Sequence, residues 1–171
     1  MTKAYISVGS NIDPFENVRK GLKLLNESAE ILALSTFWMT DPVDHEGQPK
    51  FLNGVVEIET ELDPVELKYS VLRKVEEALG RVRTGNKNAP REIDLDIVVY
   101  GDRRIVTEDV VIPDPQIESR AFLAVPLYEL NPDMILPGTE KKMYEIAGKF
   151  VDHTMEPMDD YTQSLREDLG I

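Results

Sequence analysis

The sequence predicts an α+β fold: a ferredoxin-like split βαβ arrangement, in which an antiparallel sheet has helices packed on it, with C-terminal additions. The expected elements run strand, helix, strand, strand, helix, strand up to residue 100. Both expected helices start with the same signal, DPFE at residue 13 and DPVE at residue 63, so the two halves match. The chain has 171 residues, 42% of them hydrophobic, and we expect one domain over residues 1–171.

The first half begins with a short strand expected at residues 4–8. A helix follows, in which Asp13 is the expected N-cap, Pro14 takes the first helical position and Glu16 is placed for a capping box. An apolar stripe with helical spacing predicts the face that this helix buries, formed by Phe15, Val18, Leu22 and Leu25.

Two more strands are expected at residues 31–39 and 51–60, and the polar segment TDPVDHEGQPK between them is expected to be a loop. The second helix repeats the first start signal with Asp63, Pro64 and Glu66. A glycine ends this helix after a stripe of Leu67, Val71, Val75 and Leu79.

The run DLDIVVYG is expected to form the last strand of the unit. Its apolar part, residues 97–100, has the pattern of a strand that is covered on both faces. Asp94 and Asp96 begin it, so their side chains leave one face with Cα atoms about 7 Å apart. The preceding segment RVRTGNKNAPREI reads as a basic loop in an acidic chain, with Arg81, Arg83, Lys87 and Arg91.

The C-terminal part adds smaller elements. A short strand is expected at residues 110–112 and one or two helical turns at residues 120–130. The acidic tail, residues 151–171, could close with a helix.

The amino-acid composition excludes several kinds of site and partner. The chain lacks cysteine, which excludes disulfides and thiolate metal sites and favours metal ions with oxygen ligands. Its net charge of −13 repels a nucleic-acid backbone, so we expect no nucleic-acid partner. No segment approaches the ~20 apolar residues of a membrane span, and the N-terminus lacks a signal-peptide pattern. We therefore expect no membrane partner and a cytoplasmic location.

The acidic pair at the start of the last strand has two interpretations. Asp94 and Asp96 beside Arg91 suit a magnesium–phosphate site, because magnesium is commonly held by one or two carboxylates plus substrate phosphates. Alternatively, the strand end reaches solvent and Arg91 pairs with one aspartate. Likewise, Arg81, Arg83 and Arg91 either bind a polyphosphate through bidentate hydrogen bonds or form a solvated loop.

Other polar and aromatic residues are less specific. VGSN at residues 8–11 is either a small phosphate loop or, better, a tight strand-to-helix turn. Asn53 either reads the edge of a heterocycle or packs and caps locally. His45 and His153 have no partner at ligand spacing. Four aromatic residues are expected in the core: Phe37, Trp38, Phe51 and Phe122.

Taken together, the motifs resemble a known family. AYISVGSN, FLNGVVEIET, LGRVR followed by PREIDLDIVVYG, and IPDPQIESRAFLAVPLYEL occur in this order in the 6-hydroxymethyl-7,8-dihydropterin pyrophosphokinases of folate biosynthesis. The resemblance covers about residues 3–137, and its most specific part is PR…DLDI. It implies transfer of pyrophosphate from ATP to the pterin hydroxymethyl oxygen, giving AMP, with two magnesium ions.

The resemblance also implies roles for single residues. Asp94 and Asp96 would be the magnesium ligands, and Arg81 and Arg91 the arginines that neutralise the phosphates. The pterin would contact Thr40, Pro42, Val43, Asn53 and Phe122, with Gly9, Ser10 and Asn11 in the first loop on its side. The nucleotide would contact Glu76, Arg83, Ile97, Asp114 and Arg120.

The chain departs from the family pattern on the nucleotide and lid side. Asp114 stands where the family usually has the histidine of a PHP motif. Asn88 and Ala89 replace a tryptophan and a glycine, and Glu118 stands where a basic residue is common in some members. Two rivals stay open at this point: a divergent relative acting on another pterin or nucleotide, and a non-catalytic pterin- or nucleotide-binding module. The oligomeric state is unknown.

Overall fold

The computed structural model describes residues 1–43, 47–86 and 88–171. Within these residues, six strands form one antiparallel sheet in the order β5-β1-β4-β3-β8, with β2 also paired to β4. The strands are β1 (Thr2–Ser10), β2 (Glu30–Leu34), β3 (Trp38–Thr40), β4 (Phe51–Thr60), β5 (Asp94–Tyr100) and β8 (Glu156–Pro157). A separate hairpin pairs β6 (Ile105–Val106) with β7 (Val111–Ile112).

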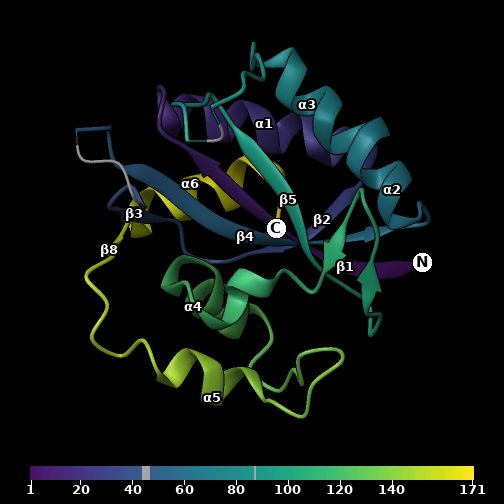
Figure 1. Ribbon diagram of the computed structural model, residues 1–171. Helices are drawn as coiled ribbons and strands as arrows, with labels where there is room; N and C mark the ends of the chain where they lie inside the picture. The colour runs from purple at the N-terminus through teal and green to yellow at the C-terminus, as the bar shows by residue number, and fades with distance from the viewer. Residues whose placement is uncertain (44–46, 87) are drawn as a thin grey trace.

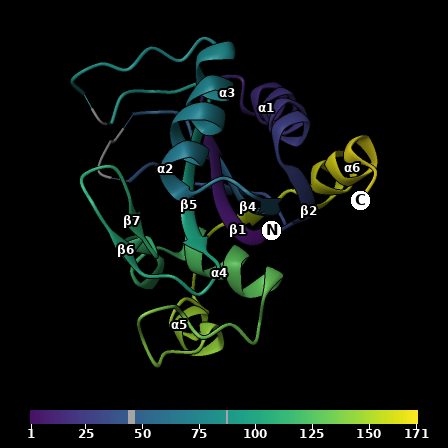
Figure 2. The same ribbon diagram turned by 90° about the vertical axis from the view of Figure 1, so that its right-hand side faces the viewer.

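Helices cover both faces of this sheet (Figures 1 and 2). One face carries α1 (Pro14–Ser28) and a helix over residues 64–78, built from α2 (Pro64–Glu66), a π segment η1 (Leu67–Leu72) and α3 (Arg73–Ala78). The other face carries α4 (Ala121–Leu130) and α5 (Met143–Gly148), which follow the short 3₁₀ helix η2 (Pro115–Glu118); the last helix is α6 (Asp159–Leu169). The predicted α+β fold with helices packed on an antiparallel sheet is therefore confirmed.

The alternation of β1 divides the core between the two faces. Ala4, Ile6 and Val8 pack with the buried stripes of α1 and of the 64–78 helix. Tyr5 packs instead among residues of α4 and α5. Because side chains on a strand alternate, the residues at positions 7 and 9 share the α4 side of the sheet with Tyr5. The functional residues described below lie on that side.

The start signals of the two helices behave differently. Asp63 forms the expected capping box with Glu66. At Asp13 the expected capping box is wrong: the residue is left-handed (φ 39°) and its side chain makes no cap hydrogen bond. Asn17 instead fixes the turn before the helix, because its side-chain amide donates to the carbonyl of Ile12 at 2.6 Å.

The single strand expected over residues 31–39 is wrong: residues 35–37 interrupt it and separate β2 from β3. Phe37 is fully buried, and its ring occupies the space that Gly54 leaves open, since a Cβ there would lie 2.7 Å from the ring. Its backbone bonds to the tail: its N–H donates to Thr162 Oγ1 at 2.9 Å, and its carbonyl accepts from Met158 N–H at 2.8 Å. The chain therefore leaves the sheet between β2 and β3.

A β-bulge shapes the edge strand β5. The register against β1 shifts between Tyr5 and Ile6, which leaves Val98 as the extra residue. Its carbonyl accepts the Asp114 N–H at 2.9 Å. The bulge thus places the segment with Asp114 beside the strand that carries Asp96.

The predicted helix in the acidic tail exists as α6 and is fastened to α1. Arg19 forms an ion pair with Asp168, donates to Ser164 Oγ at 2.7 Å and lies over the Tyr161 ring. Tyr161 in turn packs edge-on against Phe15, the one exposed residue of the predicted α1 stripe. None of the helices in the described parts of the chain combines the length and the apolarity that a membrane crossing requires.

Candidate active site

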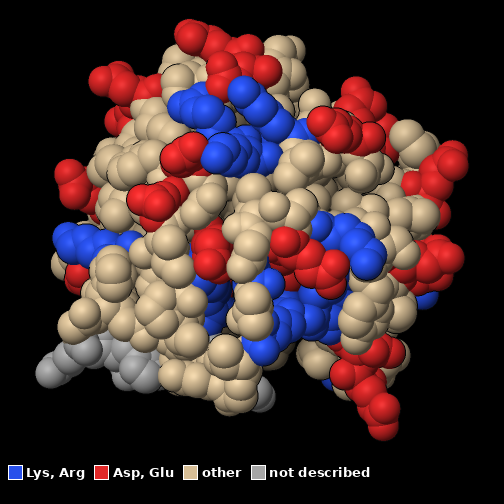
Figure 3. Space-filling view, turned by 90° about the horizontal axis from the view of Figure 1, so that it is seen from above, with Lys and Arg blue, Asp and Glu red and all other residues tan. Residues whose placement is uncertain are grey.

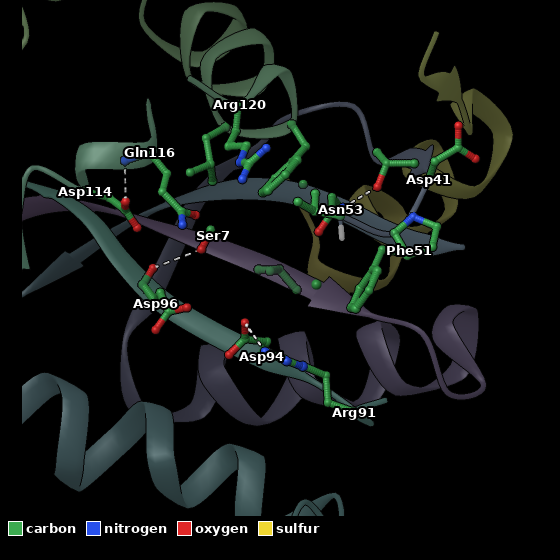
Figure 4. Close-up of a pocket in the computed structure, with 18 of the residues that line it drawn as sticks. Ser7, Asp41, Phe51, Asn53, Arg91, Asp94, Asp96, Asp114, Gln116 and Arg120 are labelled. Atoms are coloured by element: carbon green, nitrogen blue, oxygen red, sulfur yellow. Dashed lines mark hydrogen bonds and ion pairs between the residues drawn. The ribbon is translucent and has the colours of Figure 1, made fainter. Parts of the chain in front are cut away.

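A cavity of about 390 Å³ opens on the α4 side of the sheet (Figure 4). Its walls come from the ends of β1, β4 and β5, the loop after β3, and the start of α4. Figure 4 shows Asp94 and Asp96 reaching into it from β5, with Phe51 and Asn53 on the opposite side and Arg120 above.

The floor of the cavity depends on one glycine. Gly9 lies opposite Asn53 of β4 and also opposite Asp94 of β5 in the strand register. A Cβ at Gly9 would lie 2.7 Å from Asn53 Oδ1. The glycine therefore keeps the space between the amide and the carboxylate open. Residues 8–10 of VGSN belong to β1, and the tight strand-to-helix turn follows at residues 11–13, so of this motif only Asn11 lies in the turn.

An amide and two aromatic rings line the same cavity. Asn53 donates to Thr40 Oγ1 at 2.7 Å, which fixes the amide orientation. Phe51 and Phe122 both line this cavity; Phe122 also packs against the core, as expected, whereas Phe51 is only partly buried. Phe51 could have been found from the sequence, because the period of two along β4 puts it on the same face as Asn53.

One end of the cavity is acidic, and two arginines form ion pairs with Asp94 there. Asp94 accepts from Arg81 at 2.8 Å and from Arg91 at 3.2 Å. Both interpretations of the pair thus keep support: Arg91 does pair with one aspartate, yet both carboxylates line a cavity.

Glu76 fixes the positions of two arginines through ion pairs. It is almost fully buried, and its carboxylate pairs with Arg81 and Arg83. It also accepts the N–H of Leu95 at 3.0 Å, which satisfies an edge group of β5. Asp94 and Glu76 together outweigh the burial of the Arg81 guanidinium and raise its pKa.

Asp96 has a different environment from Asp94. Asp96 is exposed toward the cavity, yet the strand and the neighbouring carboxylates crowd its charged end and partly desolvate it. This desolvation, reinforced by the negative charges of Asp94, Glu76 and Asp114, raises its pKa to about 7. The pKa of Asp114 is also raised by burial, against the lowering effect of its hydrogen bond from Gln116 N–H at 2.8 Å. That bond makes Asp114 the N-cap of η2.

A second cavity of about 360 Å³ meets the first at this acidic end. Asp96, Asp114 and Gln116 line both cavities. Ile97 lines the second, together with residues of the π segment and of the β6–β7 hairpin.

Amide side chains link the loops around the first cavity. Asn11 is buried; its Oδ1 accepts the Arg91 N–H at 2.8 Å, and its Nδ2 donates to Gln48 at 3.1 Å. Gln48 in turn donates to the carbonyl of Asn88 at 2.6 Å. The loop after β3 and the basic loop before β5 are therefore joined. Sequence reasoning missed Gln48, and no sequence pattern marks it, because its partners come from distant segments.

The structure brings most of the predicted site residues together. Around the first cavity lie Thr40, Pro42, Val43, Asn53, Arg91, Asp94, Asp96, Asp114, Arg120 and Phe122. Glu76, Arg81 and Arg83 are outside the linings of both cavities and interact with one another beneath β5. Glu118 pairs with Lys141, and His153 packs edge-on against Trp38. His45 and Lys87 lie outside the described residues.

Residues 5–132 match the family model of 7,8-dihydro-6-hydroxymethylpterin-pyrophosphokinase (HPPK). The chain is 35% identical over 158 residues to 2-amino-4-hydroxy-6-hydroxymethyldihydropteridine pyrophosphokinase of Haemophilus influenzae, covering 91% of this chain and 97% of the relative. The protein of the same name from Bacillus subtilis is 39% identical over 130 residues, covering 74% of this chain and 77% of the relative.

Longer proteins match as well. The folic acid synthesis protein fol1 of Schizosaccharomyces pombe is 39% identical over 149 residues, which cover 85% of this chain but 20% of that protein. A crystal structure of Plasmodium falciparum HPPK-DHPS with STZ-DHP superposes with a TM-score of 0.71 at 13% identity, covering 97% of this chain and 46% of that one. This last likeness concerns the fold.

Proposed function

The chain belongs to the 7,8-dihydro-6-hydroxymethylpterin-pyrophosphokinase family, and from this premise we propose how its two cavities divide the substrates. The enzyme transfers the pyrophosphoryl group of ATP to the hydroxymethyl group of 6-hydroxymethyl-7,8-dihydropterin in folate synthesis. ATP is the co-substrate. The assignment of residues to the two substrates is the proposal.

The pterin occupies the first cavity. Its flat ring fits between Phe51 and Phe122, and the amide of Asn53 can bond to the polar edge of the heterocycle. Thr40, Pro42 and Val43 form the side wall. The hydroxymethyl group then points toward the acidic end.

ATP occupies the second cavity, with Ile97 against it and its phosphates directed toward the junction. The observation that carries this division is that Asp96 and Asp114 line both cavities, so the two substrates meet there. Arg91 and Arg120 line the first cavity and supply positive charge to it. Arg81 and Arg83 become available to the phosphates when they exchange their carboxylate partners.

Asp94 and Asp96 are the residues that would hold magnesium. No group of three or more acidic or histidine side chains in the described part of the chain is arranged to hold a metal ion by itself. Two carboxylates plus substrate phosphates nevertheless suit magnesium, which seldom uses an all-protein cage. Two such ions, bound between these carboxylates and the phosphates, would neutralise charge on the transferred group.

The protein contributes mainly position and charge. The hydroxymethyl oxygen attacks the β-phosphorus and gives up its proton to water. The bond between the β-phosphorus and the oxygen that bridges it to the α-phosphate breaks, and AMP leaves with that oxygen. Aromatic walls and the Asn53 amide hold the attacking group, while arginines stabilise the phosphate charge in a loose transition state. This scheme works without a histidine at position 114.

Two sets of variants test the assignment. Asp94→Ala and Asp96→Ala should each abolish turnover at saturating magnesium while keeping the folded circular-dichroism spectrum. Asp102→Ala, an exposed aspartate in the turn after β5, is the matched control and should keep activity. Near-normal turnover in either cavity variant would overturn the proposed metal site.

The pterin assignment has its own test. Asn53→Ala should weaken pterin binding more than ATP binding, because an unpaired buried heterocycle edge costs about 1–3 kcal/mol. Calorimetry measures both affinities. Equal losses for the two ligands would count against placing the pterin in the first cavity.

A further inference from the structure

Two consecutive side chains tie the β6–β7 turn to the 64–78 helix. Lys68 Nζ donates to the backbone carbonyl of Asp109, and Tyr69 Oη donates to the Asp109 carboxylate at 2.7 Å. The Tyr69 ring also has Lys68 Nζ 5.2 Å and Arg73 Cζ 5.7 Å from its centroid. Asp109 is thus held by both its backbone and its side chain.

The π segment explains why neighbours in sequence can share one partner. In an α-helix, consecutive side chains diverge by about 100°, because a turn holds 3.6 residues. Here the N–H of Arg73 bonds to the carbonyl of Lys68, five residues earlier, so the turn is wider and its side chains diverge less. Lys68 and Tyr69 can therefore both reach Asp109.

The hairpin depends on such contacts for its position. Its strands have two residues each, and an isolated hairpin of two strands is marginally stable at best. Ile112 and the turn residue Val110 are buried and join the core, whereas Val106 is 67% exposed and Asp109 is exposed. Figures 1 and 2 both show the hairpin beside the start of the 64–78 helix, where Asp109 makes its contacts.

The same contact closes one side of the second cavity. Lys68 comes from the helix, and Asp109, Val110 and Val111 come from the hairpin; all four line that cavity opposite β5. If the turn moved away from the helix, this wall would move with it.

We propose that Tyr69 and Asp109 are positioning residues for the nucleotide: their hydrogen bond holds the β6–β7 turn where the second cavity fits ATP. The proposal rests on the assignment of ATP to that cavity. Neither residue touches reacting atoms, so the contact affects ATP binding and leaves the chemical step and the pterin unaffected.

Steady-state kinetics of Tyr69→Phe and Asp109→Ala test this role. Each variant should raise the KM for ATP about two- to tenfold, the range expected for one hydrogen bond, with kcat and the pterin KM unchanged. The double variant should be no worse than either single variant, because both remove the same contact. Tyr144→Phe is the matched control, since Tyr144 is exposed and donates to the neighbouring Glu145 carboxylate away from both cavities.

A further variant tests separately whether ATP binds in the second cavity, on which the positioning role of Tyr69 and Asp109 rests. Val111→Trp fills the second cavity from a half-exposed position. If it leaves the ATP KM unchanged, ATP does not bind in that cavity and the assignment itself fails. If Val111→Trp raises the ATP KM but Tyr69→Phe and Asp109→Ala do not, the assignment stands and the positioning role is wrong. Equal increases in the KM of both substrates would also overturn the positioning role.

Discussion

Asp94 and Asp96 lie on one strand face two residues apart, yet their surroundings differ completely. Asp94 accepts from Arg81 and Arg91, whereas Asp96 is surrounded by the carboxylates of Asp94, Glu76 and Asp114. The spacing in the sequence predicts that both share a face, but it says nothing of which partners reach each one. Those partners come from the helix and the loop that cross the edge of β5.

The raised pKa of Asp96 predicts how stability changes with pH in metal-free buffer. Between about pH 4 and pH 7 the folded protein keeps the Asp96 proton that the unfolded chain has lost, so the free energy of unfolding falls as pH rises. Asp96→Asn should remove this contribution. The variant should be more stable than the parent near pH 8, on the order of 1 kcal/mol because solvent contact screens the full effect, and similar near pH 4.

Urea unfolding at several pH values measures this difference. Asp102→Asn, an exposed aspartate, should leave the pH dependence unchanged. A constant difference between Asp96→Asn and the parent across the pH range would contradict the argument.

Asp114 combines a structural role with a negative charge at the junction. The substitution Asp114→Asn would keep the cap, because asparagine caps helices as well as aspartate does, and would remove the charge. We therefore expect this variant to bind ATP more tightly, most strongly at limiting magnesium, where the phosphate charge is least neutralised. Asp114→Ala removes both features and should lose about 1 kcal/mol of stability with the cap.

Measuring ATP affinity across a magnesium titration distinguishes the two roles. Weaker ATP binding by Asp114→Asn would mean that the carboxylate helps the nucleotide instead of repelling it. Unchanged affinity would mean that its charge does not reach the phosphates.

At the scale of elements, the sequence predicts those whose signals are local. The bounds of β4 and the capping box at Asp63 follow from strand and cap patterns, and they are correct. The π segment could not be predicted, because residues 64–78 carry an ordinary helical pattern of apolar side chains. The interruption at Phe37 could not be predicted either, because it depends on Thr162, far along the chain. For the same reason the acidic pair could be found as a candidate site, whereas Gln48 and the β6–β7 turn could not.

The tail supports the sheet through one buried hydroxyl. Thr162 accepts from the Phe37 N–H at 2.9 Å and donates to the Met158 carbonyl at 2.8 Å. Thr162→Val should leave the buried Phe37 N–H unpaired and cost about 1–3 kcal/mol of stability. Thermal unfolding measures the loss, with the exposed substitution Thr154→Val as control. Equal melting temperatures for Thr162→Val and the parent would contradict this stabilising role of the hydroxyl.

At the scale of the molecule, charge is unevenly distributed within a strongly acidic chain. The net charge is −13, yet Lys and Arg gather in separate groups bordered by Asp and Glu on the face seen in Figure 3. A local group of cations can therefore attract an anion even where the net charge of the whole molecule repels polyanions.

We also propose that residues 1–171 unfold as one cooperative domain, because α6 and β8 bond to α1 and β3 across the full length of the chain. The single tryptophan, Trp38 on β3, reports the sheet by fluorescence, and circular dichroism reports the helices. Both transitions should coincide in urea. Separate midpoints would indicate two independently folding parts.

The ion pairs of Arg81 and Arg91 with Asp94 affect the order in which magnesium and the nucleotide bind. Before any substrate arrives, two cations already occupy the oxygens of this carboxylate. A magnesium ion without nucleotide would have to compete with both guanidinium groups for the Asp94 carboxylate. When the ion is bound to a triphosphate, the phosphate oxygens offer Arg81 and Arg91 new anionic partners. Asp94 then becomes free to bind the ion. We therefore expect the substrate-free enzyme to bind free magnesium weakly and to bind the ion together with the nucleotide, as a magnesium–ATP complex.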